Sequence, residues 1–343
     1  MSATFLAAAE IRAATVVSHA DLPDISAPIH YLAWRDEKLK TYERSSPAAT
    51  TLESCDALVV CGSAMACVPI EAADLFVDVL VPAGCCAVIL SGGVGRGTLA
   101  FWRELAERRL TAIFGCAWDA GSQPRSVRLP AQGVTKPVLA ATAELPADLA
   151  ERRAYCSEAD LMLELFVEQC RKRGVAVRYG GDPMAAAATE KVQPPPEQPT
   201  VFLESASTNS GANCALSAQT LARVGLDAAT AQVALVQHPQ AHLRACLTWE
   251  KQFGRRPLGW CPRPTEASLD VTTAEMLLYA LGEFRRIEAY GDASKAFLVR
   301  PADFPAHWRA PLEELEPVLK ELVASELRRP GARTAYAASL GLP

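Results

Sequence analysis

The chain has 343 residues, half of them hydrophobic, which is enough to bury the core of one large domain or of a domain with a smaller annex. The formal net charge is -5 and the basic residues are scattered, so the sequence does not suit a nucleic-acid-binding surface. No stretch reaches the roughly 20 apolar residues of a membrane span, and the 11 cysteines include no C-x-x-C pair, so we expect a cytoplasmic protein without a membrane anchor, a metal site or a disulfide framework.

Four short apolar segments are predicted to be buried parallel strands, because turn or polar residues bound each one and each is too short for a helix. They are residues 57–61, 87–90, 201–203 and 233–236. Segments with helical spacing alternate with them, at residues 70–81, 158–173, 212–224 and 243–253. This alternation predicts an α/β fold with a doubly wound, mostly parallel, Rossmann-like sheet.

The order of the predicted helices and strands divides the chain into three parts. We expect an N-terminal helical extension at residues 1–50 packed on the edge of the sheet, a Rossmann-like domain at 51–262, and a small helical C-terminal subdomain at 263–343. Helical spacing at 272–289 and 312–327 supports the last part. Two insertions interrupt the central domain at about 103–153 and 174–199, and the second is predicted to be an exposed loop because it contains Gly180-Gly181 and three consecutive prolines.

Ligands of open parallel sheets collect at the carboxyl ends of the strands, so the residues that follow each apolar run are the candidates for a site. Gly62 and Ser63 follow the first run, where glycine lets a ligand approach the backbone and the hydroxyl can bond to it; a plain tight turn is the alternative. Residues 91–98, Ser-Gly-Gly-Val-Gly-Arg-Gly-Thr, follow the second. The glycines of this turn, Gly92 and Gly93 among them, are predicted to point successive N–H groups at an anion, although the turn lacks the lysine of a Walker loop and a plain flexible turn is the alternative.

A carboxylate begins the helix predicted at 158–173. Ser157 and Asp160 have the spacing of a capping box, which is the structural interpretation of Ser157. Glu158 stands in the first helical turn, where the helix dipole stabilises negative charge. A carboxylate in that position can accept hydrogen bonds from two hydroxyls of a ribose.

Small polar side chains are concentrated at residues 204–213, between the third apolar run and the next helix. One helix cap needs only one of them, so the surplus predicts a cradle for a polar ligand. The alternative is a turn whose side chains bond to their own backbone.

The fourth apolar run is followed by two histidines and an arginine. His238 or His242 is a candidate acid or base, and the alternative is an ordinary structural role, since no nucleophile motif accompanies them. Arg244 is predicted to pair with a carboxylate, either that of a ligand or that of Glu158 or Glu204.

Taken in order, these motifs resemble the series found in the YdcF branch of the SanA/YdcF superfamily. The series comprises Val59-Val60-Cys61-Gly62-Ser63, the glycine turn at 90–95, Ser157-Glu158-Ala159, Glu204 with Ser207-Thr208-Asn209 and Asn213, residues 236–244, and the tail at 297–305. The resemblance implies a cleft that binds S-adenosylmethionine. The matching positions are Gly62, Ser63, Gly92, Gly93, Glu158, Thr208, Asn209, Asn213 and Arg244.

The chain departs from that pattern at Ala212, where an acidic residue usually precedes the asparagine, and at its two insertions. The resemblance implies a small-molecule ligand, S-adenosylmethionine or a related adenine nucleotide, and leaves the reaction, the catalytic residues and the protein partners open. A glycine-rich methyltransferase signature is absent, so an S-adenosylmethionine-dependent transferase is one option among several. The alternatives are a hydrolase or transferase of a small phosphorylated or glycan-like substrate, using Arg96, Arg244 and a histidine, and a non-catalytic scaffold with a degenerate cleft.

Overall fold

The structure is a computed structural model of the chain. It describes residues 27–42 apart from 34 and 41, 52–94 apart from 64, parts of 98–114, 126–139, 148–184, 198–262, 273–291, parts of 298–304, and 309–327. Most of the predicted N-terminal extension and the second half of the glycine turn, including Arg96, therefore lie outside the described residues.

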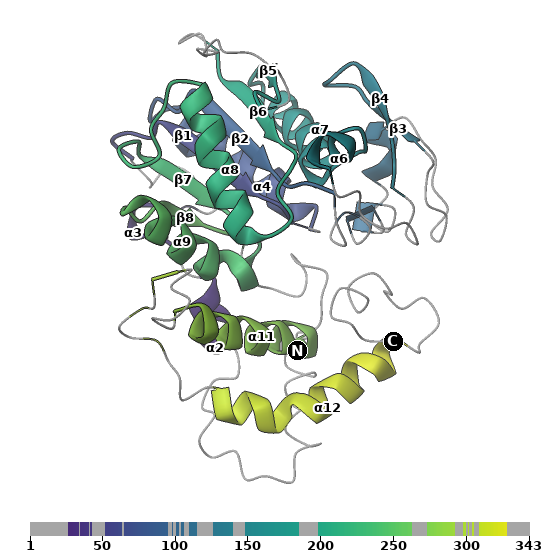
Figure 1. The fold of residues 1–343 in the computed structure, drawn as a ribbon, viewed down its shortest axis with the longest axis vertical. Coiled ribbons are helices and arrows are strands. Elements are labelled where there is room, and N and C mark those ends of the chain that lie inside the picture. The colour runs from purple at the N-terminus through teal and green to yellow at the C-terminus, as the bar shows by residue number, and fades with distance from the viewer. Residues whose placement is uncertain are drawn as a thin grey trace.

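Within the described ranges, six strands form one parallel sheet in the order β5-β6-β2-β1-β7-β8 (Figure 1). The strands are β1 (Ala57–Cys61), β2 (Ala87–Ser91), β5 (Arg178–Gly181), β6 (Thr200–Glu204), β7 (Val233–Val236) and β8 (Leu258–Trp260). Every residue of the four predicted strands is buried, as a sheet covered on both faces requires. The predicted α/β, Rossmann-like fold is confirmed.

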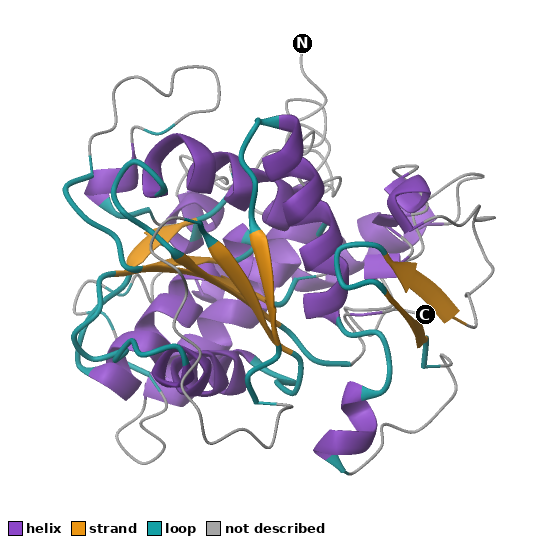
Figure 2. Cartoon of the chain, turned by 90° about the horizontal axis from the view of Figure 1, so that it is seen from above, coloured by secondary structure: helices purple, strands orange, loops and turns teal. Residues whose placement is uncertain are grey.

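Helices cover both faces of the sheet (Figure 2). The helices against the sheet are α4 (Cys67–Leu75), which continues as the π-helical segment η2 (Phe76–Leu80), α7 (Glu158–Lys172), α8 (Ser210–Arg223) and α9 (Pro239–Phe253). Side chains of β1 alternate between two cores: Leu58 and Val60 pack with α4 and α7, whereas Val59 and Cys61 pack with α8 and α9. The sheet is therefore doubly wound.

The strand order reverses at β1. This strand pairs with β2 on one side and with β7 on the other, and the connections that leave the two sides lie on opposite faces. In open α/β sheets a crevice forms at such a reversal, outside the carboxyl ends of the strands. The loops after β1, β2 and β7 are thus the ones that the fold brings to a ligand-binding position.

The prediction that residues 174–199 form an exposed loop is wrong at its start. Arg178–Gly181 is the edge strand β5, parallel to β6. The sequence of this strand, Arg-Tyr-Gly-Gly, is not an apolar run. An edge strand does not need one, because it is covered on fewer sides than a central strand. Glycine suits position 180 because a Cβ there would lie only 2.3 Å from the ring of Phe202 and would clash with it.

The first insertion contains an antiparallel hairpin of β3 (Ser126–Leu129) and β4 (Val134–Pro137), which the sequence pattern did not indicate. It also contains the short helices η3 (Leu110–Phe114) and α6 (Leu149–Arg153). The hairpin is attached to α7, because Lys136 Nζ lies 2.8 Å from an oxygen of Asp160 and Ala131 N donates to Glu164 at 3.0 Å.

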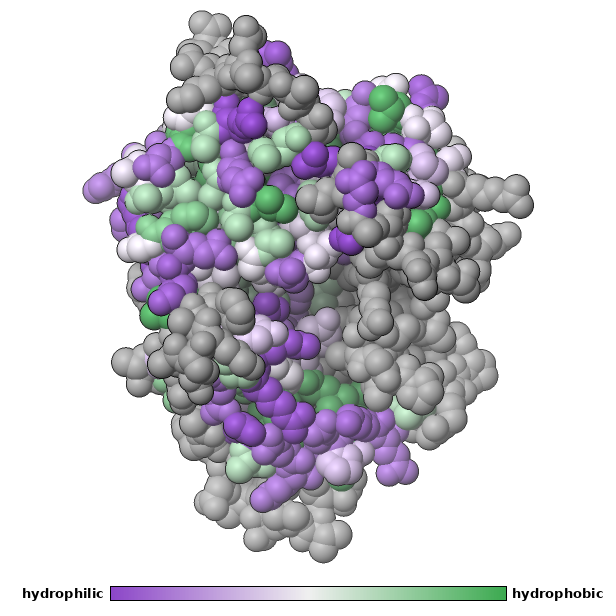
Figure 3. All heavy atoms as spheres, viewed as in Figure 1, coloured by the Kyte–Doolittle hydropathy of each residue, from purple (hydrophilic) through white to green (hydrophobic). Residues whose placement is uncertain are grey.

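Helices from both ends of the chain form a group that contacts α9 and β8. They are α2 (Ala27–Leu32), α3 (Glu37–Lys40), α11 (Thr273–Gly291) and α12 (Arg309–Leu327). α11 packs against α2, α9 and α12, and Asp36 N donates to Gly259 O of the edge strand β8. Ion pairs join α11 to α12, including Arg285 with Glu316, and Figure 3 shows hydrophilic side chains gathered over these two helices. None of the described helices is both long and apolar enough to cross a membrane.

Candidate functional site

The carboxylate of Glu158 lies against the ends of β1 and β2. A Cβ on Gly62 would lie 2.6 Å from Oε2 of Glu158, and a Cβ on Gly92 would lie 3.0 Å from its Cβ. A side chain at position 62 would displace the carboxylate of Glu158, and one at position 92 would crowd its Cβ, so glycine at both positions suits this placement of Glu158. The structure thereby brings together three of the predicted site residues, which are 30 or more positions apart in the sequence.

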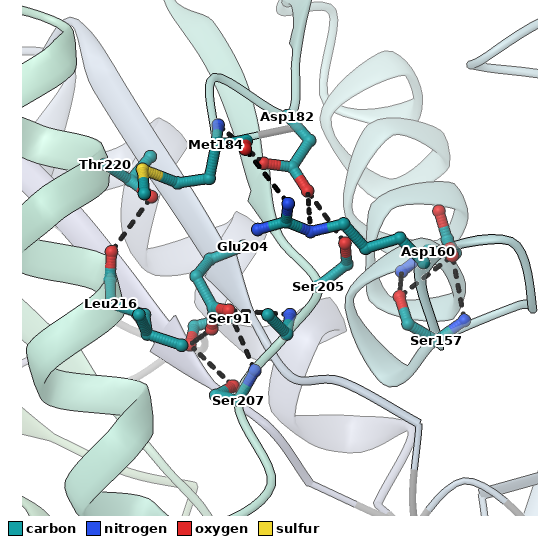
Figure 4. Close-up of polar contacts among 12 residues, drawn as sticks. Ser91, Ser157, Asp160, Asp182, Met184, Glu204, Ser205, Ser207, Leu216 and Thr220 are labelled. Atoms are coloured by element: carbon teal, nitrogen blue, oxygen red, sulfur yellow. Dashed lines mark hydrogen bonds and ion pairs between the residues drawn. The ribbon is translucent and has the colours of Figure 1, made fainter. Parts of the chain in front are cut away.

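Helix α7 is fixed to the glycine turn by its first two N–H groups. Glu158 N donates to Gly93 O at 3.2 Å and Ala159 N donates to Gly92 O at 2.9 Å. The predicted capping box is confirmed, since Ser157 Oγ accepts a hydrogen bond from Asp160 N at 3.1 Å and Ser157 N donates to Asp160 Oδ2 at 2.8 Å (Figure 4). The position of Glu158 thus follows from the local sequence.

The carboxylate of Glu158 has no hydrogen-bond or ion-pair partner among the residues that the structure describes. Burial raises the pKa of its carboxyl to about 7, and no other group offsets that effect. The residue as a whole is only partly covered. An acceptor without a donor at a helix N-terminus is available for a ligand that supplies hydroxyl groups.

The glycine turn has a structural function at Gly92 and Gly93. Gly92 N donates to Glu204 O at 2.9 Å and Gly93 N donates to Ser207 O at 2.7 Å. A Cβ on Gly93 would lie 2.4 Å from the same carbonyl oxygen of Ser207. The expectation that these two N–H groups face an anion is therefore wrong, because the neighbouring loop already uses them.

Glu204 organises the loop that follows β6. Its buried carboxylate accepts hydrogen bonds from Ser91 Oγ at 2.6 Å, Ala206 N at 2.7 Å and Ser207 N at 2.9 Å (Figure 4). Sequence reasoning did not single out Ser91 as a partner. Because three donors bond to its carboxylate, Glu204 has a structural role that does not require an ion pair with Arg244.

The polar loop after β6 lies on the same edge as the glycine turn, because Ser207 and Gly93 are hydrogen-bonded. Asn209 caps α8 through its side chain, which accepts from Ala212 N at 2.9 Å, so the self-bonded alternative is right for this residue. Thr208 is exposed. Asn213 is buried in the first turns of α8, and its backbone carbonyl lies 3.5 Å from Ser91 Oγ.

The loops after β1 and β7 are joined by Gln237. Its Nε2 donates to Gly62 O at 3.0 Å and its Oε1 accepts from His238 N at 2.8 Å. Ser63 closes the adjacent turn by accepting from Met65 N at 3.0 Å. Gln237 was not a predicted site residue, and its position directly after an apolar run is the signal that marks it.

The two histidines lie in different environments. His242 is buried, with Nε2 3.5 Å from the sulfur of Cys246, and it belongs to the core. His238 is the N-cap residue of α9, partly exposed, with its ring edge-on to Tyr279 at 6.0 Å between centroids. Burial lowers the pKa of His238 to about 4, so its ring is neutral at pH 7.

Arg244 pairs with Glu283 of α11 through both Nε and Nη2, the second at 3.1 Å. The predicted pairing with Glu158 or Glu204 is therefore wrong. The reason is that α9 begins at Pro239, four residues before the predicted start, and carries Arg244 on the side that contacts α11.

Fold and site together define an α/β protein with a Rossmann-like sheet and an unpaired carboxylate at the edge where such sheets bind ligands. Among the described residues, no group of three or more His, Cys, Asp or Glu side chains has the arrangement of a metal site. A scan against protein-family models finds no match to this chain, and a search of curated proteins finds none either.

Proposed function

We propose that the chain binds an adenosine-type small molecule, with S-adenosylmethionine as the first candidate, across the carboxyl ends of β1 and β2. The observation that carries the proposal is the carboxylate of Glu158, which lies between two glycine turns without a partner among the described residues. Two vicinal hydroxyls of a ribose supply the two donors that such a carboxylate accepts.

The surroundings of Glu158 suit the remainder of a nucleoside. Thr208 is exposed on the neighbouring loop and Asn213 lies in the first turns of α8, so both offer further hydrogen-bonding groups near the ends of the strands. The resemblance to YdcF proteins, which carries the choice of S-adenosylmethionine, supports the same ligand class.

A phosphate at the glycine turn is less well supported. The N–H groups of Gly92 and Gly93 are engaged by Glu204 and Ser207. A phosphate placed there would also face the carboxylate of Glu158, and like charges repel. The geometry therefore favours a ligand that donates hydrogen bonds over one that only accepts them.

Calorimetric titration with S-adenosylmethionine tests the proposal. Replacing Glu158 with alanine is expected to weaken binding by about 1–3 kcal/mol, or roughly 5- to 150-fold, because hydrogen bonds to a charged group are lost. The control is Glu168→Ala on the same helix, whose carboxylate pairs with Arg171 instead and whose loss is expected to leave binding unchanged. Wild-type protein that shows no binding at millimolar ligand, or a Glu158→Ala variant with unaltered affinity, would refute the proposal.

A further inference from the structure

A row of polar side chains lines the contact between α9 and α11, which we call the α9–α11 seam. Gln240, Arg244 and Leu247 are four and seven positions apart and so share one side of α9. Arg244 bonds to Glu283 of α11, and the carbonyl of Leu247 accepts from Val299 N. That side of α9 therefore faces α11 and the segment at Val299.

Gln240 is buried in this seam with its hydrogen bonds unmade. The residue is 0% exposed, and neither Nε2 nor Oε1 has a hydrogen-bond partner among the residues that the structure describes. His238, two residues earlier, also has a buried ring nitrogen, Nδ1, without a hydrogen bond. A buried polar group without a partner is costly, and two of them at one helix start require an explanation.

The charged residues of the seam do not supply the missing bonds. Glu283 is buried and bonds to Arg244 and Arg286. Burial raises the pKa of its carboxyl, but the two guanidinium groups together lower this pKa more, so it lies below the ordinary value. The charges are thus paired with one another. Two uncharged groups of the seam therefore lack hydrogen bonds to any described residue. They are the carboxamide of Gln240, which has a donor beside an acceptor, and one nitrogen of the neutral ring of His238.

The start of α9 is connected to the edge where Glu158 lies. His238 N bonds to Gln237, Gln237 bonds to Gly62 O, and Gly62 lies against the carboxylate of Glu158. His238 is therefore joined by hydrogen bonds to the edge where Glu158 lies, and its ring contacts Tyr279 of α11.

We infer that the start of α9 is a second binding subsite, in which Gln240 and His238 take a planar, uncharged group that carries a hydrogen-bond donor beside an acceptor. A carboxamide makes paired hydrogen bonds of this kind with the edge of an adenine base. The inference rests on the proposed function, since it assigns the base of a nucleoside to the seam and its ribose to Glu158. Because no part of Gln240 is exposed, entry of the base requires α11 to move away from α9.

The stability of the ligand-free protein gives the first test. Gln240→Met removes a carboxamide without partners and is expected to raise the melting temperature by a few degrees, because an apolar side chain of similar size replaces unmet polar atoms. Gln169 is the matched control, since it is also buried but donates to Asp74 at 2.7 Å, and Gln169→Met is expected to lower the melting temperature. A Gln240→Met variant that melts lower than wild type would mean that an ordered water already satisfies Gln240, and the inference would be wrong.

Binding gives the second test, with adenosine and purine riboside, which lacks the 6-amino group, as probes. Wild-type protein is expected to bind adenosine about tenfold more tightly than purine riboside, the value of one hydrogen bond in the seam. In Gln240→Met that preference is expected to vanish. If Gln240→Met keeps the preference for adenosine, the seam is not the base subsite, and the nucleoside proposal still stands. If the wild-type protein binds neither probe, both the nucleoside proposal and this inference are wrong.

Discussion

At pH 8, the Glu158→Gln variant is expected to be more stable than the wild-type protein by up to about 3 kcal/mol. Burial raises the pKa of Glu158 to about 7 from an ordinary value of 4.5, so the folded state holds its proton more tightly than the unfolded state does. Wild-type stability therefore falls as the pH rises from 4.5 to 7, and the whole penalty is present above 7. Glutamine removes the charge and with it the penalty.

Urea unfolding of both proteins at pH 5 and pH 8 measures this difference. At pH 5 the gain from the substitution is expected to shrink to less than about 1 kcal/mol, because the unfolded state is then partly protonated too. Glu168→Gln is the control on the same helix: the pKa of Glu168 is lowered by its hydrogen bond to Arg171, so its loss has the opposite sign and slightly destabilises the protein at pH 8. A Glu158→Gln protein no more stable than wild type at pH 8 would contradict the description of Glu158 as a desolvated, unpaired carboxylate.

A raised pKa does not by itself mark the site. Burial also raises the pKa of Glu164, on the same helix, to about 7, but its carboxylate accepts from Ala131 N at 3.0 Å and so has a structural function. Glu158 differs because no described residue donates to it. A carboxylate that lowers stability and makes no contact in return is typical of a residue kept for binding.

Glu204→Ala is expected to destabilise the protein by about 3 to 5 kcal/mol. The substitution removes the acceptor of three buried donors, namely the hydroxyl of Ser91 and the N–H groups of Ala206 and Ser207. The loop that carries Thr208 would then lose its attachment to β2. The loss is expected to exceed that of any replacement of Glu158, since Glu204 has partners and Glu158 has none.

Chemical denaturation of Glu204→Ala beside Glu204→Gln checks this expectation. Glutamine keeps one acceptor oxygen and the shape of the side chain, so its cost is expected to lie between wild type and alanine. A cost below about 1 kcal/mol for Glu204→Ala would show that water replaces the carboxylate, and the loop would then not depend on Glu204.

The central strands were predictable from the sequence because their burial leaves a direct signature. Residues 57–61 and 233–236 are apolar throughout, and both are buried strands in the structure. The strand at Arg178–Gly181 carries no such signature, since at the edge of the sheet its side chains are only partly covered. An edge strand such as β5 forms because it pairs with a neighbouring strand, and the local order of apolar residues in the sequence does not reveal that pairing.

The candidate site was predictable where it depends on local chemistry. The spacing of Ser157 and Asp160 fixed where α7 begins, and this placed Glu158 at a helix N-terminus facing the strand ends. The partners of Arg244 and of the N–H groups of Gly92 and Gly93 were not predictable, because they depend on how α11 and the loop after β6 pack. Long-range pairing of this kind follows from the tertiary arrangement alone.

The most direct test of Glu158 as a ribose-binding group is an NMR titration of its carboxyl carbon, assigned by comparison with Glu158→Gln. In the free protein the pKa is expected near 7. With S-adenosylmethionine bound it is expected to fall by about one to two units, because hydroxyl donors stabilise the charged carboxylate. A pKa that stays near 7 while the ligand is bound would contradict the assignment.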